Sequence, residues 1–525
     1  MKHFKITFKP DDREITIHKG ATLFEAAGQA GIILNTACGG RGICGKCEVI
    51  LELGGEKVLA CQYRIERDLV VTIPASSRFF EQKILAEGVE TAGIQPDIYE
   101  KYLNIQPKEQ ILGVSVDIGT TTVVAKLIDM ASGRCLATEA ALNPQTQYGD
   151  DVVSRIAYAE TDDKLNELQK AILDCVNDLI GRLCIQAKIE SNRIFEVCTV
   201  GNTTMNHIFL KLPVKQLGHA PYRAYSLDAK DSPAEESSLQ INPAGNIHTV
   251  ENIAGFVGSD TTAVALAIDI DTFEKMSLIV DIGTNGEIVV GTADELYAAS
   301  CAAGPAFEGA RISCGSRAVE GAIEAVVVNE DDIVLDVIGN NQAHSICGSG
   351  LIDAVAVLLN LGIVDSSGRF AEAASLEGRL SAKILSRIIE QDDQPAFVLD
   401  DAQKVVLTQA DIRQVQLAKS AIRAGIILLE RKLGIEDGDI EEIFLAGAFG
   451  NYIRAESALR LKILPDVPTE RIRFVGNAAS SGAQMILLSR QSREKAGQLA
   501  RKIEYVEIAH QPDFQEVFAD CMAFL

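Results

Sequence analysis

The sequence lacks the features that mark membrane-spanning, secreted and disordered proteins. Tryptophan is absent, aromatic residues make up 5% of the 525 residues and hydrophobic residues 47%, and no disordered tail is evident. No apolar run reaches the ~18 residues that a membrane span needs, and the first residues, MKHFKITFKP, contain no apolar signal segment. We therefore expect a globular, cytoplasmic protein without a membrane partner.

Positive charge is scarce as well. The chain has 49 Lys and Arg against 73 Asp and Glu, which gives a net charge of −24. Nucleic acid is excluded as the main partner, because neutralising phosphates requires a surplus of Lys and Arg. Residues 1–78 are the exception, with 11 basic and 9 acidic residues. This module could rest against an acidic surface, but we favour the simpler interpretation that the charges are unrelated.

Four of the twelve cysteines are concentrated in one short window. Cys38, Cys44 and Cys47 form C-x5-C-x2-C, and Cys61 follows after thirteen residues. Histidine is absent between residues 19 and 206, which excludes a Rieske-type site. Three close cysteines and one distant cysteine favour a [2Fe-2S] centre, with structural zinc and unligated thiols as the alternatives. We expect the other eight cysteines to be reduced thiols.

The same window also contains part of a phosphate-binding loop pattern. Gly40, Gly45 and Lys46 stand at the positions of G-x-x-x-x-G-K. Cys47 replaces the Ser or Thr that contacts magnesium, and EVILEL then alternates like a strand, where a phosphate-binding loop opens a helix. The glycines are better explained by a cluster loop, whose backbone approaches sulfur closely.

The segments around the cysteines predict a small α+β domain over residues 1–78. KHFKITF, REITI, EVILEL and DLVVTI read as strands, and residues 21–31 as a helix that begins near Thr22 and ends at Gly31. This order resembles the β-grasp fold of plant- and adrenodoxin-type ferredoxins. The short interval between Cys47 and Cys61 is a departure from the plant proteins and predicts a trimmed loop.

After an irregular linker, residues 79–108, two similar strand–turn–strand units appear 164 residues apart. ILGVSVDIGTTTVVAKLID contains Asp117 and MSLIVDIGTNGEIVVG contains Asp281. Glycine and hydroxyl residues in a tight hairpin suit phosphate, and a carboxylate at the strand end suits magnesium. The repeat predicts two similar halves that face one another. The predicted phosphate contacts are Gly119, Thr120, Thr121, Thr122, Gly283, Thr284, Asn285 and Gly286.

Residues 109–525 resemble the superfamily of acetate and sugar kinases, chaperone ATPases and actin. This α/β fold implies two ribonuclease-H-like subdomains, about 109–272 and 273–525, that close on ATP. LAGAFG matches the adenosine motif and implies contacts from Gly447, Ala448 and Phe449, while Ala448 replaces the commoner second glycine. CGSGLIDAVAVLL and VGNAASSGAQMI each open an apolar helix, and the first adds Gly348, Ser349 and Gly350 to the predicted site. Glu308 is a candidate general base, with a helix-capping carboxylate as the alternative.

The combination of a [2Fe-2S] domain with this ATPase resembles the reductive activators of corrinoid proteins. That resemblance implies Mg²⁺ and ATP as cofactors, a corrinoid protein of a methyltransferase system as partner, and an upstream low-potential electron donor; a homodimer is one assembly that it leaves open. None of the seven histidines has an Asp two residues before it, so the D-x-H-x-x-G cobalamin motif is absent and cobalt is expected in the partner. An extra middle region that some relatives carry is expected to be absent.

Two other functions stay open at this stage. The chain could be an ATP-gated electron donor to another low-potential metalloenzyme, or a small-molecule kinase or nucleotide sensor with a regulatory cluster. Cys301, Cys314 and Cys347 lie near the expected cleft, but their irregular spacing favours small buried residues over a second metal site.

Overall fold

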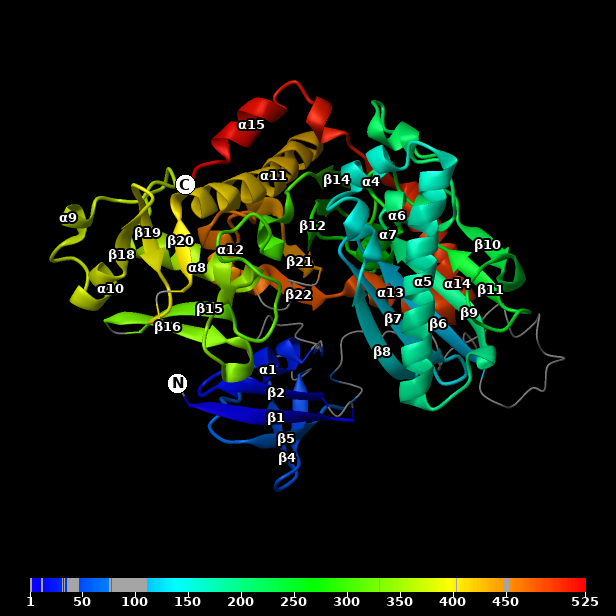
Figure 1. Ribbon diagram of the computed structural model, residues 1–525, viewed down its shortest axis with the longest axis horizontal. Helices are drawn as coiled ribbons and strands as arrows, with labels where there is room; N and C mark the ends of the chain where they lie inside the picture. The colour runs from blue at the N-terminus through cyan, green and yellow to red at the C-terminus, as the bar shows by residue number, and fades with distance from the viewer. Residues whose placement is uncertain are drawn as a thin grey trace.

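The computed structural model describes residues 2–10, 13–30, 32, 34, 47–74, 77, 111–329, 331–402, 404–447 and 453–525. It forms two large lobes, with a smaller N-terminal domain next to them (Figure 1). The predicted ligands Cys38 and Cys44, the predicted adenosine contacts Ala448 and Phe449, and the linker lie outside the described residues. Within the described ranges, no helix is both long enough and apolar enough to cross a membrane.

The N-terminal domain is a five-stranded sheet in the order β2-β1-β5-β3-β4, with β1 and β5 parallel. Every second side chain of β1 enters the core, including Phe4, Ile6 and Phe8. Helix α1 (Leu23–Gln29) begins with a capping box between Thr22 and Glu25, as the sequence predicts. The four predicted strands form, and β4 is a fifth that was not predicted. The strands are β1 (His3–Lys9), β2 (Arg13–His18), β3 (Glu48–Leu51), β4 (Glu56–Leu59) and β5 (Leu69–Thr72).

The first lobe contains a six-stranded sheet in the order β10-β11-β9-β6-β7-β8. Its strands are β6 (Leu112–Ile118), β7 (Thr122–Asp129), β8 (Cys135–Leu142), β9 (Ile194–Gly201), β10 (Lys230–Pro233) and β11 (Asn246–Thr249). Its helices are α4 (Val152–Tyr158), α5 (Asp162–Ala187), α6 (Thr203–Phe209) and α7 (Ser259–Ile268). The apolar stripe of α5 packs on one face of the sheet, next to β7 and β8.

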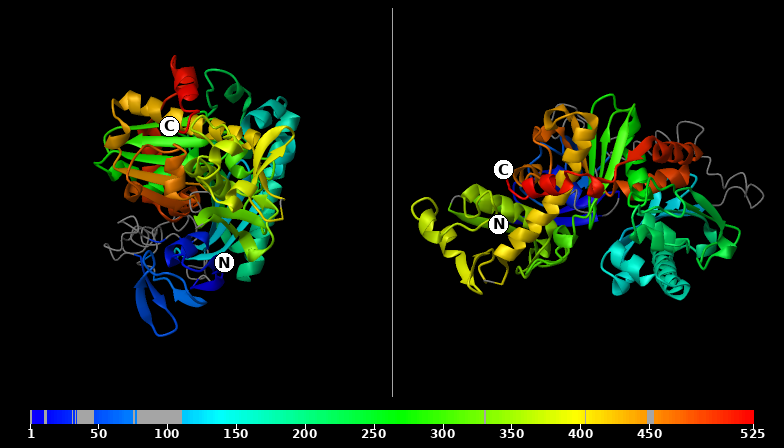
Figure 2. Two further views of the ribbon diagram at one scale, coloured as in Figure 1. Left: turned by 90° about the vertical axis from the view of Figure 1, so that its left-hand side faces the viewer. Right: turned by 90° about the horizontal axis from the view of Figure 1, so that it is seen from above.

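The second lobe repeats this plan, in the order β22-β21-β12-β13-β14-β23. The strands are β12 (Ser277–Ile282), β13 (Gly286–Gly291), β14 (Leu296–Cys301), β21 (Glu442–Ala446), β22 (Ile472–Gly476) and β23 (Ile503–Tyr505). Its helices include α8 (Gly348–Leu361), α11 (Gln409–Leu433), α12 (Ala455–Arg460) and α15 (Phe514–Asp520). Viewed from above, the cyan elements of the first lobe and the yellow elements of residues 370–410 lie at opposite ends of the molecule (Figure 2).

Two helices near the C-terminus join the lobes. Helices α13 (Ala478–Leu488) and α14 (Arg490–Lys502) follow β22 of the second lobe. Helix α13 nevertheless packs on α7, β6 and β9 of the first lobe. One apolar cluster contains α7 and α13 together with Ile279 and Val289 of the second sheet. The two sheets therefore share a buried helical layer.

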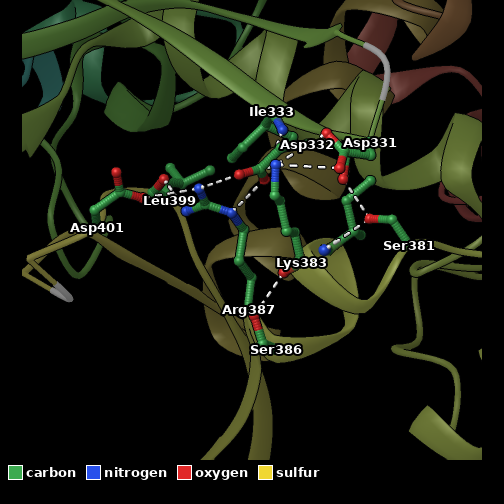
Figure 3. Close-up of polar contacts among 10 residues, drawn as sticks. Asp331, Asp332, Ile333, Ser381, Lys383, Ser386, Arg387, Leu399 and Asp401 are labelled. Atoms are coloured by element: carbon green, nitrogen blue, oxygen red, sulfur yellow. Dashed lines mark hydrogen bonds and ion pairs between the residues drawn. The ribbon is translucent and has the colours of Figure 1, made fainter.

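Two small sheets complete the second lobe. One consists of β15 (Ala322–Asn329), β16 (Asp332–Val337) and β17 (Ser345–Ile346), and the other of β18 (Ile388–Gln391), β19 (Gln394–Val398) and β20 (Val406–Thr408), with α9 (Ala373–Leu376) and α10 (Ala382–Ser386) beside them. Arg387 links these sheets: its guanidinium donates to both oxygens of Asp332, at 2.7 and 3.0 Å, and to the carbonyl of Leu399 at 2.8 Å (Figure 3). This anchors the start of β16.

Candidate functional site

The two DIGT motifs form hairpin turns at equivalent ends of the two large sheets. In the first turn, the backbone N–H of Gly119 donates to the carbonyl of Thr122 at 3.0 Å. A Cβ at Gly119 would lie 2.6 Å from that oxygen, so only glycine fits. In the second turn, the N–H of Gly283 donates to the carbonyl of Asn285 at 2.9 Å. Both units are the strand–turn–strand structures that the sequence predicts.

The hairpins face one another across the lobes. The hydroxyl oxygens of Thr121 and Thr284 lie 3.5 Å apart. The carboxylate of Glu308, which ends the short helix η7 (Pro305–Glu308), accepts hydrogen bonds from Thr121 at 3.2 Å and Thr284 at 2.8 Å. The prediction that the two halves meet at these motifs is therefore confirmed, and Glu308 lies at their contact. Its carboxylate contacts hydroxyl groups, which does not support the helix-capping alternative.

Four acidic side chains gather behind the hairpins. Burial raises the pKa of Asp117 to about 6. Burial also raises the pKa of Asp281 to about 7, and the charges of Asp260 and Asp117 add to this effect. The pKa of Asp260 rises to about 7, mainly by burial and then by the charge of Asp117. Glu287 has a pKa well above its usual range because of burial and the charges of Asp260 and Asp281. The cluster therefore carries mutually repelling charges that a cation would relieve.

This arrangement fits magnesium that arrives together with a phosphate. Mg²⁺ usually keeps several waters and takes one or two carboxylates plus the oxygens of a nucleotide. Over the described ranges, no group of three or more His, Cys, Asp or Glu side chains is close enough to hold a metal ion by itself. The residues thus suit a magnesium–nucleotide complex better than a resident metal.

Two asparagines that the sequence analysis did not select support the motifs. Asn202 caps α6 with its side-chain oxygen and donates through Nδ2 to the hydroxyl of Thr120 at 3.0 Å. Asn477 caps α13 in the same way and donates through Nδ2 to Asp117 at 3.0 Å. Both belong to the tripeptide Val-Gly-Asn between a strand and a helix. That repeat is the sequence signal that could have identified them.

Two further side chains fix the backbone of the first hairpin. Buried Arg155 donates to the carbonyl of Thr120 at 2.6 Å, and Asn143 donates to the carbonyl of Gly119 at 2.9 Å. Burial lowers the pKa of Arg155 to about 10, which leaves the guanidinium charged at neutral pH. No local motif predicts these contacts, because Arg155 lies in α4 and Asn143 follows β8, both outside the hairpin. They place a positive charge behind a turn that is predicted to receive phosphate.

The predicted adenosine and helix residues fall into two groups. Gly447 has a φ of +94°, and a Cβ there would lie 2.5 Å from the carboxylate of Asp281, so this glycine adjoins the second motif. At the start of α8, Ser349 donates to the carbonyl of Glu324 at 2.8 Å. A Cβ at Gly350 would lie 2.2 Å from the carbonyl of Ile323. The start of α8, Gly348 to Gly350, therefore packs closely on β15, and a nucleotide contact there stays a prediction.

The remaining predicted phosphate residues open the strands that follow the turns. Thr122 is the exposed first residue of β7. Gly286 is the buried first residue of β13, and a Cβ there would lie 3.0 Å from a side-chain carbon of Ile422. Both strands begin directly after the facing hairpins, and a phosphate contact at Thr122 or Gly286 stays a prediction.

Two of the four predicted cluster ligands lie side by side. The sulfur atoms of Cys47 and Cys61 are 3.3 Å apart. Two thiolates about 2.3 Å from one tetrahedral metal lie roughly 3.8 Å from each other, so this pair could hold a single metal atom after the two sulfur atoms move apart by roughly 0.5 Å. Gln62 donates through Nε2 to the Cys61 sulfur at 3.6 Å. By contrast, Cys301 and Cys347 are buried thiols and belong to no described metal-binding group.

Comparisons with known proteins agree with this arrangement. Family models match residues 6–66 (2Fe-2S iron-sulfur cluster binding domain), 112–273 (RACo middle region) and 275–525 (C-terminal domain of RACo, the ASKHA domain). The expectation that a middle region is absent is wrong, because residues 112–273 match it.

Two relatives whose functions are known match most of the chain. The corrinoid activation enzyme RamQ of Eubacterium limosum is 32% identical over 98% of both chains. The [Co(II) methylated amine-specific corrinoid protein] reductase of Methanosarcina barkeri is 26% identical over 74% of this chain and 72% of its own. A solved structure, a reductive activator for corrinoid, iron-sulfur protein, is 31% identical, with a TM-score of 0.73 and coverage of 99% of this chain and 98% of that chain.

Proposed function

Because the chain belongs to the family of reductive activators of corrinoid proteins, we propose that it uses ATP to drive an electron from a [2Fe-2S] cluster to the Co(II) corrinoid of a partner protein. The product is the Co(I) form that a methyltransferase system uses. One observation carries this proposal: the chain matches such an activator over 98% of its length and contains both parts that the reaction needs. The two DIGT hairpins meet where the hydroxyl oxygens of Thr121 and Thr284 lie 3.5 Å apart, and the N-terminal domain contains a pair of adjacent thiols.

The need for ATP follows from the reduction potentials of the cluster and of its acceptor. A plant-type cluster lies near roughly −400 mV, and each ~59 mV by which an acceptor lies lower costs about 1.4 kcal/mol for one electron. ATP can offset this cost only if it binds two conformations with different affinity. The facing hairpins supply such a site, because a ligand held by both has a different affinity when the lobes separate.

We assign roles to the residues as follows. Asp117 and Asp281 position magnesium and water, and the turn residues from Gly119 to Thr122 and from Gly283 to Gly286 hold the phosphates. Gly447, Ala448 and Phe449 lie beside adenosine, and Glu308 is the candidate base. Cys38, Cys44, Cys47 and Cys61 hold the cluster, which supplies one-electron transfer when bound.

The setting of the protein is part of the same proposal. A low-potential electron donor reduces the cluster, and a homodimer is the assembly to test first. The ten described cysteines form no disulfide with one another, which supports a reducing, cytoplasmic location. We retain residues 1–78 as the cluster domain, 79–108 as the linker, and 109–525 as the ATPase with subdomains of about 109–272 and 273–525.

The decisive test is spectroscopic. The protein is purified without oxygen, its cluster is reduced, and it is mixed with a Co(II) corrinoid protein with and without Mg-ATP. We expect Co(I) absorbance only with Mg-ATP, and its loss in Asp281→Asn, which leaves the cluster thiols intact. Zinc at the thiols, or Co(I) formation independent of ATP, would overturn the proposal. Phosphoryl transfer to a sugar or an organic acid would instead indicate a kinase.

A further inference from the structure

Two histidines of the N-terminal domain contact a single carboxylate of the second lobe. His3 on β1 and His18 on β2 are directly paired in the antiparallel register, so their imidazoles project from the same face. Nε2 of His3 lies 3.3 Å from one oxygen of Asp336, and Nε2 of His18 lies 3.9 Å from the other. Asp336 belongs to β16, and Figure 1 shows β1 and β2 beneath the β15–β16 hairpin.

The low exposure of the His3, His18 and Asp336 side chains shows that this contact excludes much of the solvent. The His3 side chain is 19% exposed and the His18 side chain 32%, although they lie on the outer face of the N-terminal sheet. The Asp336 side chain is 9% exposed. A carboxylate removed from water needs a compensating donor or cation. In the part of the chain that the structure describes, no Lys or Arg forms an ion pair with Asp336, and the imidazoles fill that role.

The other charged groups near this contact are accounted for. Glu324 on β15 is half-buried, and its pKa is raised to about 7 by burial and then by the charge of Asp336. Lys5 and Glu14, on the same outer face as the histidines, form an ion pair with each other at 2.7 Å. Asp332, on the same face of β16 as Asp336, is held by Arg387 (Figure 3). Among the described residues, the groups that face Asp336 from the N-terminal domain are therefore the two imidazoles.

We propose that the β15–β16 hairpin is the docking surface for the N-terminal domain, and that the contacts of His3 and His18 with Asp336 set the strength of this docking. The carboxylate of Asp336 is removed from water, so it relies on the two imidazoles as its partners across the contact. Removing either side of the contact should therefore weaken docking.

This docking ties the N-terminal domain to the second lobe in particular. The β15 strand is fixed to α8, because Ser349 donates to the Glu324 carbonyl and Gly350 packs on Ile323. Helix α8 in turn packs beside η7, which ends at Glu308. A movement of the second lobe therefore carries the docking surface with it. This inference goes beyond the proposed function, because it concerns a contact between two parts of this chain and not the electron acceptor.

The test measures the distance between the two bodies in the full-length protein with its cluster oxidised. Spin labels are attached through unnatural amino acids at Glu56 and Glu390, two exposed positions on the N-terminal domain and on β18. Pulsed dipolar spectroscopy then gives the distance distribution. We expect one defined distance for the parent protein, and a docked-to-undocked ratio that falls by roughly three- to tenfold when the contact with Asp336 is removed.

Two variants and a control decide the outcome. Asp336→Asn should broaden the distribution, because it keeps the size of the side chain but removes the carboxylate that the histidines contact. The double variant His3→Gln, His18→Gln should do the same from the other side of the contact, and it decides the matter if Asp336→Asn fails to fold. The control, Lys5→Gln with Glu14→Gln, alters the same sheet face and should leave docking unchanged. A parental distribution that both variants retain would overturn the proposal.

Discussion

The raised pKa of Asp281 predicts that the affinity for Mg-ATP increases with pH. Magnesium takes the ionised carboxylate, whereas burial and the charges of Asp260 and Asp117 favour the protonated form. With a pKa of about 7, roughly nine-tenths of the Asp281 carboxyls are ionised at pH 8 and roughly one-tenth at pH 6. If binding requires the ionised form, this residue alone lowers the affinity about tenfold between these pH values, equivalent to about 1.4 kcal/mol.

The assay is isothermal titration with Mg-ATP at pH 6, 7 and 8, for the parent protein and for Asp281→Asn. The terminal phosphate of ATP also titrates in this range, but it contributes equally to both proteins. The informative quantity is therefore the ratio of the two affinities at each pH. We expect the parent to lose about tenfold more affinity than the variant between pH 8 and pH 6.

The comparison between the parent protein and the variant allows this prediction to be refuted. A variant that loses affinity in parallel with the parent would show that Asp281 does not exchange a proton for magnesium, and the assignment of this carboxylate would then be wrong. For a second variant, Asp117→Asn, the parent-to-variant ratio of affinities should change by less over this range and mainly near pH 6, because the pKa of Asp117 is about 6 and Asp281 still titrates in this variant.

Four further predictions test other parts of the structure. Arg387→Lys should lower the free energy of unfolding in urea by about 1–3 kcal/mol, because lysine cannot make the paired contacts of the guanidinium. The control Lys383→Gln removes an exposed ion pair and should lower the free energy of unfolding by less than about 1 kcal/mol. Glu308→Gln should reduce kcat for ATP hydrolysis by about 10²–10⁴-fold if the carboxylate is the general base, with Mg-ATP affinity nearly unchanged; a loss below tenfold would assign it a positioning role. Cys61→Ser should remove bound iron and visible absorbance but leave Mg-ATP affinity intact, and retained iron would refute this ligand. Without nucleotide, the unfolding temperature measured by differential scanning calorimetry should rise as the pH falls from 8 to 6. The reason is that the pKa of Asp281 is raised in the folded protein, so folding takes up protons. An unfolding temperature that falls over this range would contradict the prediction.

The hairpins were predictable because their information is local. An apolar strand that ends in Asp-Ile-Gly-Thr leaves few alternatives to a tight turn, and both copies form it. The strand β4 was missed because its residues, Glu56–Leu59, lack buried alternation and are exposed or half-buried. Its position depends on pairing with β3 and not on its own pattern.

The polar support of the site could not be predicted in the same way. Asp260 lies in the first turn of α7, and only the packing of the lobes brings its charge beside Asp281. The contact between Asn477 and Asp117 joins residues 360 positions apart. Likewise, His3 and Asp336 are separated by 333 positions, and the charge imbalance of residues 1–78 did not identify either residue. Such pairs follow from tertiary structure, which no local pattern records.

The contacts at the site suggest which of them a moving lobe must break. Asn477 caps α13, which packs on β6, so its bond to Asp117 stays within one packed unit. The contacts of Thr121 with Thr284 and Glu308 cross between the two hairpins and involve only side-chain hydroxyls and one carboxylate. Hydroxyl groups exchange partners with phosphate oxygens at little cost, since each lost bond is replaced. On the proposed assignment, ATP substitutes for the bridging contacts while Asp117 keeps its own support, and the difference in affinity between the joined and the separated lobes arises at Thr121 and Thr284.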